Sequence, residues 1–215
     1  HGKEFGGANR VLIALMAKDG DIFTPEFFAT LEKATADLFF IPGVDRAQVT
    51  SLFTPNVRFT EVVEDGIAGG NVIPADFSPT PEGLERVRQN ILKAGITGRL
   101  VANDFSGAMI SAQLMEDDPN TGKKLDYIAV GRLLEEKIRG PYESDRIQVH
   151  IIGFAKVISD IADGAVRIVF FFLIAMAVTT VLVYFYTRSY KLTLLLILCS
   201  VVAVIWQLGM LPLLG

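Results

Sequence analysis

The sequence predicts an α+β domain followed by a hairpin of two membrane-spanning helices, and two observations support this prediction. The last quarter of the 215-residue chain holds two apolar runs, 168–187 and 192–215, of twenty and twenty-four residues without a charge. The preceding part contains two copies of a strand-helix-strand pattern with an irregular segment between them. The membrane helices and the sheet domain therefore occupy separate parts of the sequence.

Each apolar run is long enough to cross a bilayer, because a helix rises about 1.5 Å per residue and the hydrocarbon core is about 30 Å thick. Only residues 188–191 separate the runs, so we expect antiparallel spans at about 166–187 and 192–215. The linker carries Arg188 and Lys191, and cations in short loops stay in the cytoplasm. This predicts an inner-membrane protein with residues 1–163 on the extracytoplasmic, or periplasmic, side. A buried hairpin in a large soluble protein is the alternative, but two such runs rarely fit in a chain of this size.

Charge is segregated along the chain. All 24 acidic residues lie at or before Asp163, and three of the 20 cations lie at or after Arg167, which leaves 17 cations against 24 acids in the remainder. An acidic surface disfavours nucleic acid and docking on anionic lipid. The single cysteine, Cys199, lies inside the second apolar run, so disulfides play no part. The first ten residues lack the apolar core of a signal peptide, and we interpret the chain as a fragment that begins after an earlier span.

The first strand-helix-strand unit covers residues 10–53. Residues 10–17 (RVLIALMA) are predicted as a strand, and Thr24-Pro25-Glu26 provides the N-cap and first turn of a helix that ends before Pro42-Gly43. A second strand follows at about 44–53. The inward face of the helix is predicted to hold Phe27, Phe28, Leu31, Ala34, Thr35 and Leu38.

An insertion, residues 54–107, follows the first unit. We expect a strand at 57–63, and we assign no secondary structure to the glycine-rich connection at 67–74. Thr80-Pro81-Glu82 opens a helix that ends at Gly95 and buries Leu84, Val87 and Ile91. A further strand is predicted at 99–105.

The second unit covers residues 108–152. Its first strand, 108–115, is expected to pair with 99–105 through a tight hairpin at Ser106-Gly107, and a loop follows at 117–124. A helix at 125–139, ended by Gly140-Pro141, leads to a strand at 146–152. The predicted buried residues of this helix are Tyr127, Val130, Gly131, Leu134 and Ile138.

Two such units in one sheet, with both helices on one face, make a ferredoxin-like domain over residues 1–153. We expect 154–187 to be one helix that runs from this domain into the first span, so that 154–215 forms the membrane hairpin. A continuous helix transmits tilt or force, whereas a flexible linker does not.

Three stretches carry a resemblance to a known family. They are FGGANRVLIAL at Phe5 to Leu15, IPGVDRAQVTSL at Ile41 to Leu52 and VVAVIWQLGMLPLLG at Val201 to Gly215. With the order of the parts, they resemble the resistance-nodulation-division (RND) transporter superfamily, in its hydrophobe/amphiphile efflux (MMPL-like exporter) branch.

The resemblance implies a twelve-span, proton-driven exporter. This chain would hold its first porter domain and spans two and three, with the bilayer, the remaining spans and a second porter domain as partners. The interiors of both spans lack ionisable residues, so the proton relay is expected elsewhere.

An enzyme, a cofactor or a metal centre is not predicted. The only histidines are His1 and His150, and His150 is expected on the surface. The glycine pairs Gly6-Gly7 and Gly69-Gly70 lack the flanking pattern of a phosphate loop.

The most plausible functional surface is one face of the predicted sheet. Alternation places Met16, Met109, Gln113 and Met115 on the face opposite to the aliphatic one, and flexible, polarizable methionine suits varied apolar guests. We therefore predict these four residues along a route for a hydrophobic molecule or lipid. The alternative is that the same face packs against a neighbouring porter subdomain.

Two functions stay open at this point. The first is a segment of a proton-coupled exporter of hydrophobic or amphiphilic molecules. The second is a membrane protein that does not transport, such as an accessory subunit similar to SecD/SecF or an extracytoplasmic sensor. The full-length reading frame distinguishes them, whereas the substrate and the oligomeric state, a homo-oligomer included, are not predicted.

Overall fold

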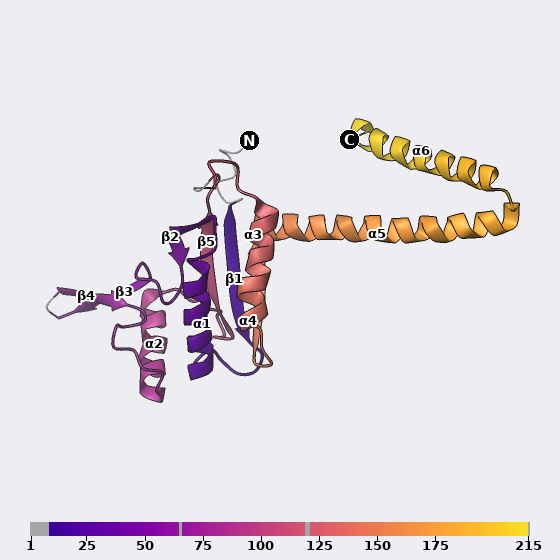
Figure 1. Ribbon diagram of the computed structural model, residues 1–215. Helices are drawn as coiled ribbons and strands as arrows, with labels where there is room; N and C mark the ends of the chain where they lie inside the picture. Colours follow the sequence, from indigo (N-terminus) through magenta and orange to yellow (C-terminus); the bar gives the residue numbers. More distant parts are fainter. Residues whose placement is uncertain (1–8, 65, 119–120, 215) are drawn as a thin grey trace. The chain divides into compact units, whose positions relative to one another are not determined.

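A computed structural model describes residues 9–64, 66–118 and 121–214, and its contacts divide the chain into two compact units that meet between Ile161 and Ala162 (Figure 1). The predicted Gly6-Gly7 turn lies outside the described residues. The first unit is a sheet domain, and the second consists of two long helices. The structure therefore has the coarse α+β organisation that the sequence predicts.

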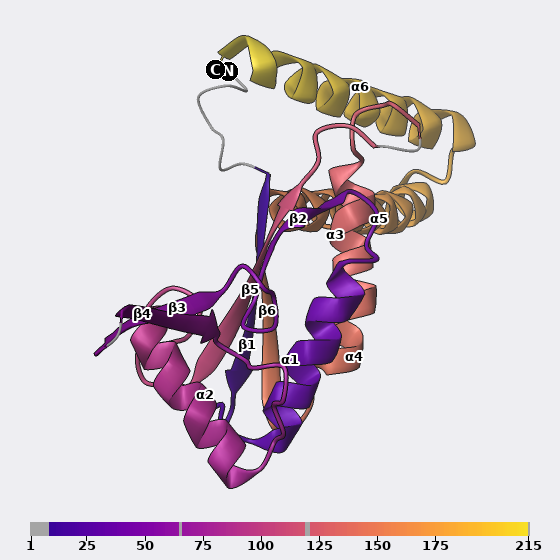
Figure 2. The same cartoon turned by 90° about the vertical axis from the view of Figure 1, so that its left-hand side faces the viewer.

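The sheet domain is built on four antiparallel strands in the order β2-β5-β1-β6 (Figure 2). They are β1 (Arg10–Ala17), β2 (Val44–Thr50), β5 (Gly107–Leu114) and β6 (Ile147–Gly153). Strand β1 pairs with β5 on one side and with β6 on the other, so the two strand-helix-strand units interleave in one sheet. Figure 2 shows α1 and the α3–α4 segment along the same side of the strands.

Helix α1 (Pro25–Leu38) confirms the prediction made from its capping signal. The Thr24 hydroxyl accepts a hydrogen bond from the Phe27 N–H at 3.2 Å, and Pro25 occupies the first turn, where its missing N–H costs no bond. The helix ends at Leu38, a few residues before Pro42-Gly43. Its buried residues are the six that the sequence predicts.

The insertion contains one element that the sequence analysis did not assign. Strands β3 (Arg58–Val63) and β4 (Gly66–Asn71) form a separate two-stranded hairpin. The sequence of β4, GIAGGN, has almost no side chains that favour a strand. Its pairing is close, because a Cβ on Gly69 would lie 2.7 Å from the Phe59 carbonyl oxygen.

Helix α2 (Pro81–Ala94) agrees with its prediction at both ends. Thr80 caps its N-terminus, and Gly95 ends it with a φ of 61°, a conformation that glycine adopts without steric cost. Leu84, Val87 and Ile91 are buried as expected. Lys93 holds the helix against β3 through an ion pair with Glu61 at 2.6 Å.

The strand predicted at 99–105 is wrong. This segment makes isolated bridges at Val101, with Ala108 and with Thr97, and is otherwise irregular; residues 100–102 do hydrogen-bond to the start of β5 across the predicted return at Ser106-Gly107. Phe105 adopts a φ of 58° and stacks on Phe23 with 5.4 Å between ring centroids. Packing of this ring into the core prevents the extended backbone that the sequence pattern favoured.

The helix predicted at 125–139 is shorter at its start, changes type, and continues past its predicted end. It comprises α3 (Tyr127–Leu134), the π-helix η1 (Glu135–Arg139) and α4 (Gly140–Tyr142). The Gly140 N–H donates to the Glu135 carbonyl, five residues back. The hydrogen bonds of the helix therefore already have the wider π-helical spacing before Pro141. Gly140-Pro141 therefore does not end the helix. Of the predicted buried residues only Tyr127 differs, because it is half-buried.

Strand β6 passes directly into helix α5 (Phe154–Thr187), which is continuous over the residues predicted. Gly153 allows this junction, because its φ is 152° and a Cβ there would lie 2.5 Å from the Arg10 carbonyl oxygen. Gly131 allows α3 to approach the first turns of α5, since its Cβ would lie 2.6 Å from the Ser159 Cβ.

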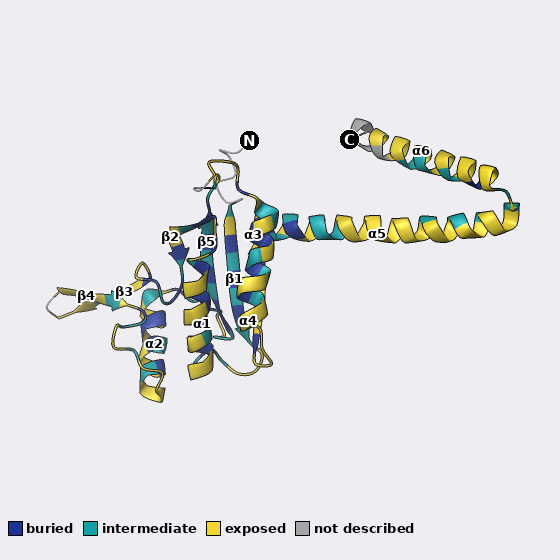
Figure 3. Ribbon diagram, viewed as in Figure 1, coloured by how far each residue is buried: buried dark blue, intermediate teal, exposed yellow. Residues whose placement is uncertain are grey.

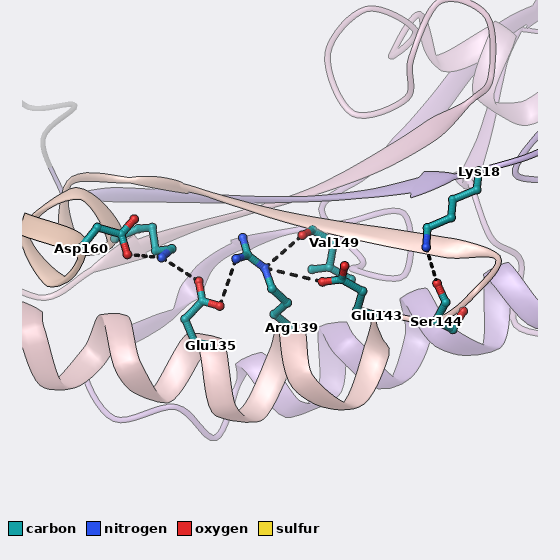
Figure 4. A network of polar contacts seen from close by, with 8 residues as sticks. Lys18, Glu135, Arg139, Glu143, Ser144, Val149 and Asp160 are labelled. Atoms are coloured by element: carbon teal, nitrogen blue, oxygen red, sulfur yellow. Dashed lines mark hydrogen bonds and ion pairs between the residues drawn. The ribbon is translucent and has the colours of Figure 1, made fainter. Parts of the chain in front are cut away.

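Polar contacts also fix the start of α5 within the sheet domain (Figure 4). Lys156 pairs with Glu135 of η1 at 2.9 Å and with Asp160 one turn further along α5. Glu135 pairs in turn with Arg139 at 3.1 Å, and the Arg139 Nε donates to the Val149 carbonyl of β6 at 3.1 Å. The first turns of α5 are thus attached to η1, and η1 to the sheet.

The second unit comprises the rest of α5 and α6 (Tyr190–Leu214), joined by Arg188 and Ser189. The linker is two residues shorter than predicted, because α6 already begins at Tyr190. Thr187 and Thr193 hydroxyls hydrogen-bond at 3.0 Å across the turn. Both helices are long and apolar enough to cross a membrane, and Figure 3 shows exposed residues along most of their described length. Helices that are apolar all round need a nonaqueous environment.

Candidate functional site

The two faces of the four-stranded sheet differ in burial (Figure 3). On the face covered by helices, alternate residues of the central strand β1 (Val11, Ile13 and Leu15) are at most 1% exposed. The opposite face, which we call the open face, is half-buried or exposed. Its residues are Leu12, Ala14 and Met16 of β1, Met109, Ser111 and Gln113 of β5, and Gln148, His150 and Ile152 of β6.

The segment 98–103 extends one edge of this open face. Strand β2 pairs with β5 only between Leu114 and Ser111. Nearer the start of β5, the neighbouring segment is instead the one that contains Leu100 and Ala102. The Met109 N–H donates to the Leu100 carbonyl at 2.7 Å, and the Ala102 N–H donates to the Gly107 carbonyl at 2.9 Å. Asp104 accepts hydrogen bonds from the hydroxyl and N–H of Ser106, which lower the pKa of its carboxyl and stabilise the return turn.

Two adjoining hollows lie between this segment and the open face. The first, of about 260 Å³, is mainly apolar, with Ala14, Met16 and Met109 on the sheet side. The second, of about 440 Å³, is polar and is lined by Arg10, Gln48, Thr50, Ser111 and Gln113 among others. Gly98, Arg99, Leu100 and Met109 line both hollows, so the two form one continuous surface that is apolar at one end and polar at the other.

Met16 lies directly over Gly107 at the apolar end. The two residues are opposite each other in the β1–β5 ladder, and a Cβ on Gly107 would lie 2.2 Å from the Met16 sulfur. The absence of a side chain at 107 therefore creates the space that the Met16 thioether occupies. A larger residue at 107 would push this side chain into the hollow.

Three of the four predicted site residues come together here. Met16 and Met109 line the apolar hollow, and Met109 and Gln113 line the polar one. Met115 lines neither hollow: it lies beyond the end of β5, where its N–H donates to the Gly43 carbonyl at 2.8 Å.

Arg10 and Arg99 also belong to this site, although neither was predicted from the sequence. Arg10 has the same alternation phase in β1 as Leu12, Ala14 and Met16, so an extension of that pattern by one step would have identified it. Arg99 had no such signal. It reaches the hollows because its segment forms turns instead of the predicted strand.

The electrostatics of the two hollows contrast with the rest of the domain. None of the described residues that line them is Asp or Glu, although the remainder of the chain before Arg167 has an excess of acids. Asp45 is opposite Gln113 in the ladder, but its carboxylate accepts a hydrogen bond from the Ala47 N–H and does not line the hollow. Among the described residues, Arg10 and Arg99 have no ion-pair partner.

Arg88, unlike Arg10 and Arg99, has an ion-pair partner. Its guanidinium pairs with Asp21 at 2.7 Å and lies 4.2 Å from the centroid of the Phe23 ring. Such a group is committed to holding α2 against the start of α1. The guanidinium groups of Arg10 and Arg99 have no comparable structural contact.

The fold and these hollows define the chain as an α+β sheet domain with an open, amphipathic face and two apolar helices suited to a membrane. Comparison with protein-family models and with curated proteins gives no match to this sequence. Within the described part of the chain, no three His, Cys, Asp or Glu side chains gather as metal ligands would.

Proposed function

We propose that this chain is part of a membrane exporter of hydrophobic or amphiphilic molecules, in which the open face lines the substrate route. The observation that carries the proposal is the pair of adjoining hollows around Met109, one apolar and one polar. Such a surface can meet water at one moment and an apolar guest at another. The polar hollow, of about 440 Å³, lies in the lower part of the range of small-molecule sites, about 300–1,000 Å³, and the apolar hollow, of about 260 Å³, lies just below it.

The strand order supports a ferredoxin-like fold for the sheet domain. Strands β1, β2, β5 and β6 in the order β2-β5-β1-β6, with α1 and α3 on one face, have the connectivity of a split β-α-β domain. The segment between β2 and β5 is then an insertion that provides both the β3–β4 hairpin and the segment 98–103 of the site. An RND-like porter domain is our proposal on this basis together with the sequence resemblance.

The membrane arrangement belongs to the same proposal. We place Arg188 and Lys191 in the cytoplasm of a cell with an inner membrane, and the sheet domain outside it. Proton coupling, as in RND exporters, would depend on ionisable groups supplied by other spans, because 168–187 and 192–214 contain no Asp, Glu, His, Lys or Arg.

Photolabelling tests whether the open face meets an amphiphile. The chain in phosphatidylcholine nanodiscs is irradiated with a diazirine derivative of decanol, an uncharged probe, and labelled peptides are mapped by mass spectrometry. We expect labelling within residues 107–114, reduced at least about fivefold by Met109→Glu, because a carboxylate against an alkyl chain must be desolvated.

Met115→Glu is the matched control, because it makes the same change on a half-buried methionine outside both hollows. It should leave the labelling unchanged. Absence of labelling on the open face of the wild-type chain would contradict the proposed substrate route. A melting temperature far below wild type for Met109→Glu would mean instead that this face packs against protein.

A further inference from the structure

The amphipathic character of the two hollows indicates what kind of guest they suit, and this inference rests on the proposed function. We infer that the open face binds a single-chain amphiphile with an anionic head group. The head group pairs with Arg10 and Arg99 in the polar hollow, and the alkyl chain lies over Met109 and Met16 in the apolar hollow. Carboxylate and phosphate share the chemistry required.

The polar hollow offers hydrogen-bond donors without a competing acid. Arg10 comes from β1 and Arg99 from the segment 98–103, so two arginines from separate parts of the chain line one hollow. Arginine binds carboxylate and phosphate through its planar fork of N–H groups. The other lining side chains, Gln48, Thr50, Ser111 and Gln113, are amides and hydroxyls that donate as well.

The positive charge of the polar hollow disfavours binding of a cationic guest more strongly than binding of a neutral one. Two arginines would repel a quaternary ammonium, and the hollows contain no acidic residue to offset them. Arg10 and Arg99 are exposed and make no ion pair with a described residue, so an incoming anion can pair with them without first displacing an acid. An incoming anion supplies the missing partner.

The position of Met109 connects the two ends of the guest. Met109 lines both hollows, and it is opposite Ala14 in the β1–β5 ladder, two residues before Met16 on the same face. A chain that leaves the head group at Arg10 therefore passes Met109 before it reaches Met16. The apolar hollow is lined there by small or flexible residues, which adapt to chains of different shape.

A free amphiphile fits better than the surface of an anionic bilayer. The hollows are small concavities of about 260 and 440 Å³, and a bilayer surface is nearly flat on that scale. The excess of acids over cations before Arg167 would also repel an anionic membrane. We therefore assign the site to one monomeric molecule.

The test uses the whole chain in phosphatidylcholine nanodiscs and three photoreactive C10 probes: a carboxylate, the corresponding alcohol and a trimethylammonium. At pH 8 the carboxylate should label residues 107–114 about tenfold more strongly than the alcohol, in proportion to one or two charge-assisted hydrogen bonds. The ammonium should label least. Unlabelled decanoate should compete for the site, whereas vesicles of anionic phospholipid at equal lipid concentration should not.

Arg10→Gln/Arg99→Gln should abolish the preference for the carboxylate over the alcohol, measured as the ratio of labelling by the two probes. Arg58→Gln is the matched control, because Arg58 is an exposed arginine on the separate β3–β4 hairpin and its loss removes the same kind of charge. If the double variant does not accumulate, each single variant should reduce the preference by about threefold.

The outcomes separate this inference from the proposed function. Equal labelling by carboxylate and alcohol, or an unchanged preference in the arginine variants, would overturn the anionic head group and leave the substrate route standing. Labelling by none of the three probes on the open face would contradict both. Competition by anionic vesicles would overturn the assignment to a monomeric guest.

Discussion

At the scale of single residues, Gly107 and Met16 determine the shape of the apolar hollow. Gly107 leaves room for the Met16 thioether, and the Leu15 carbonyl oxygen would lie 2.8 Å from a Cβ at the same position. One obstacle is a flexible side chain and the other is backbone. The Met16 side chain and the Leu15 backbone therefore each add to the steric cost of a larger residue at position 107. A pair of variants can distinguish the two contributions.

We expect Gly107→Ala to destabilise the sheet domain by about 1–3 kcal/mol, because a methyl group is forced into an occupied space. The measurement is the calorimetric melting temperature of the chain in detergent. Adding Met16→Ala should recover only part of the loss, since the contact with the Leu15 backbone remains. Gly164→Ala is the control, because a Cβ there meets nothing within 4 Å. A melting temperature unchanged by Gly107→Ala would contradict the close approach.

A second residue pair, Tyr142 and Asp37, attaches α4 to α1. The Tyr142 hydroxyl donates to the Asp37 carboxylate at 2.5 Å. Burial, and then this hydrogen bond, raise the pKa of Tyr142 to about 12. The phenol therefore remains a neutral hydrogen-bond donor at physiological pH.

At the scale of secondary-structure elements, helix α5 is the feature that spans both compact units. Its first turns are attached to η1 and β6 through Lys156, Glu135 and Arg139, and its apolar run begins at Ile168. A continuous helix between these two parts would pass a change of tilt from one to the other. The proposal of coupling by α5 depends on that continuity.

Ala162→Pro tests the coupling. Proline at this position removes a backbone donor and clashes with the preceding turn, at a cost of about 3 kcal/mol or more. Insertion into the membrane should persist, because residues 168–187 are unchanged, and the proposed export, assayed in cells, should fall much further. Ala162→Gly weakens the helix by only about 1 kcal/mol and should reduce export little. If the proline variant inserts normally and exports at the wild-type rate, the proposal of rigid coupling is wrong.

At the scale of the whole molecule, the acidic residues and the apolar helices are separated along the sequence, close to the boundary between the two compact units. All acidic residues lie at or before Asp163, and the linker of the apolar helices carries Arg188. Across that linker, the hydroxyls of Thr187 and Thr193 hydrogen-bond to each other, and Thr193 is only 5% exposed. The tip of the hairpin therefore combines a cation with a hydrogen-bonded threonine pair that joins the ends of the two helices.

The orientation follows from these charges and is open to direct measurement. Single cysteines are placed at Ser189 and at Thr121 in a Cys199→Ser background, and intact cells are treated with an impermeant thiol reagent. We expect Thr121→Cys to react and Ser189→Cys to react only after the cells are opened. The reverse pattern would invert the proposed topology, and equal reaction at both sites would argue against a spanning hairpin.

The sequence by itself determined those parts of the protein that depend on local patterns. Threonine-proline caps begin α1 and α2, alternation separates the two faces of β1 and β5, and uncharged length identifies α5 and α6. Each of these signals is contained within one element, because capping, period-two alternation and helix length need no distant partner. The same alternation placed Met16, Met109 and Gln113 on the open face.

Only the tertiary structure decided the features that depend on contacts between distant segments. The glycine-rich β4 forms a strand because β3 pairs with it, and Phe105 turns the chain because its ring packs on Phe23. Widened turns at η1 admit Pro141, and Met115 lies away from the hollows because β5 ends before it. Arg99 joins Arg10 at the polar hollow for the same reason: its position is set by a loop that returns to β5, and a loop of this kind has no periodicity from which its contacts can be predicted.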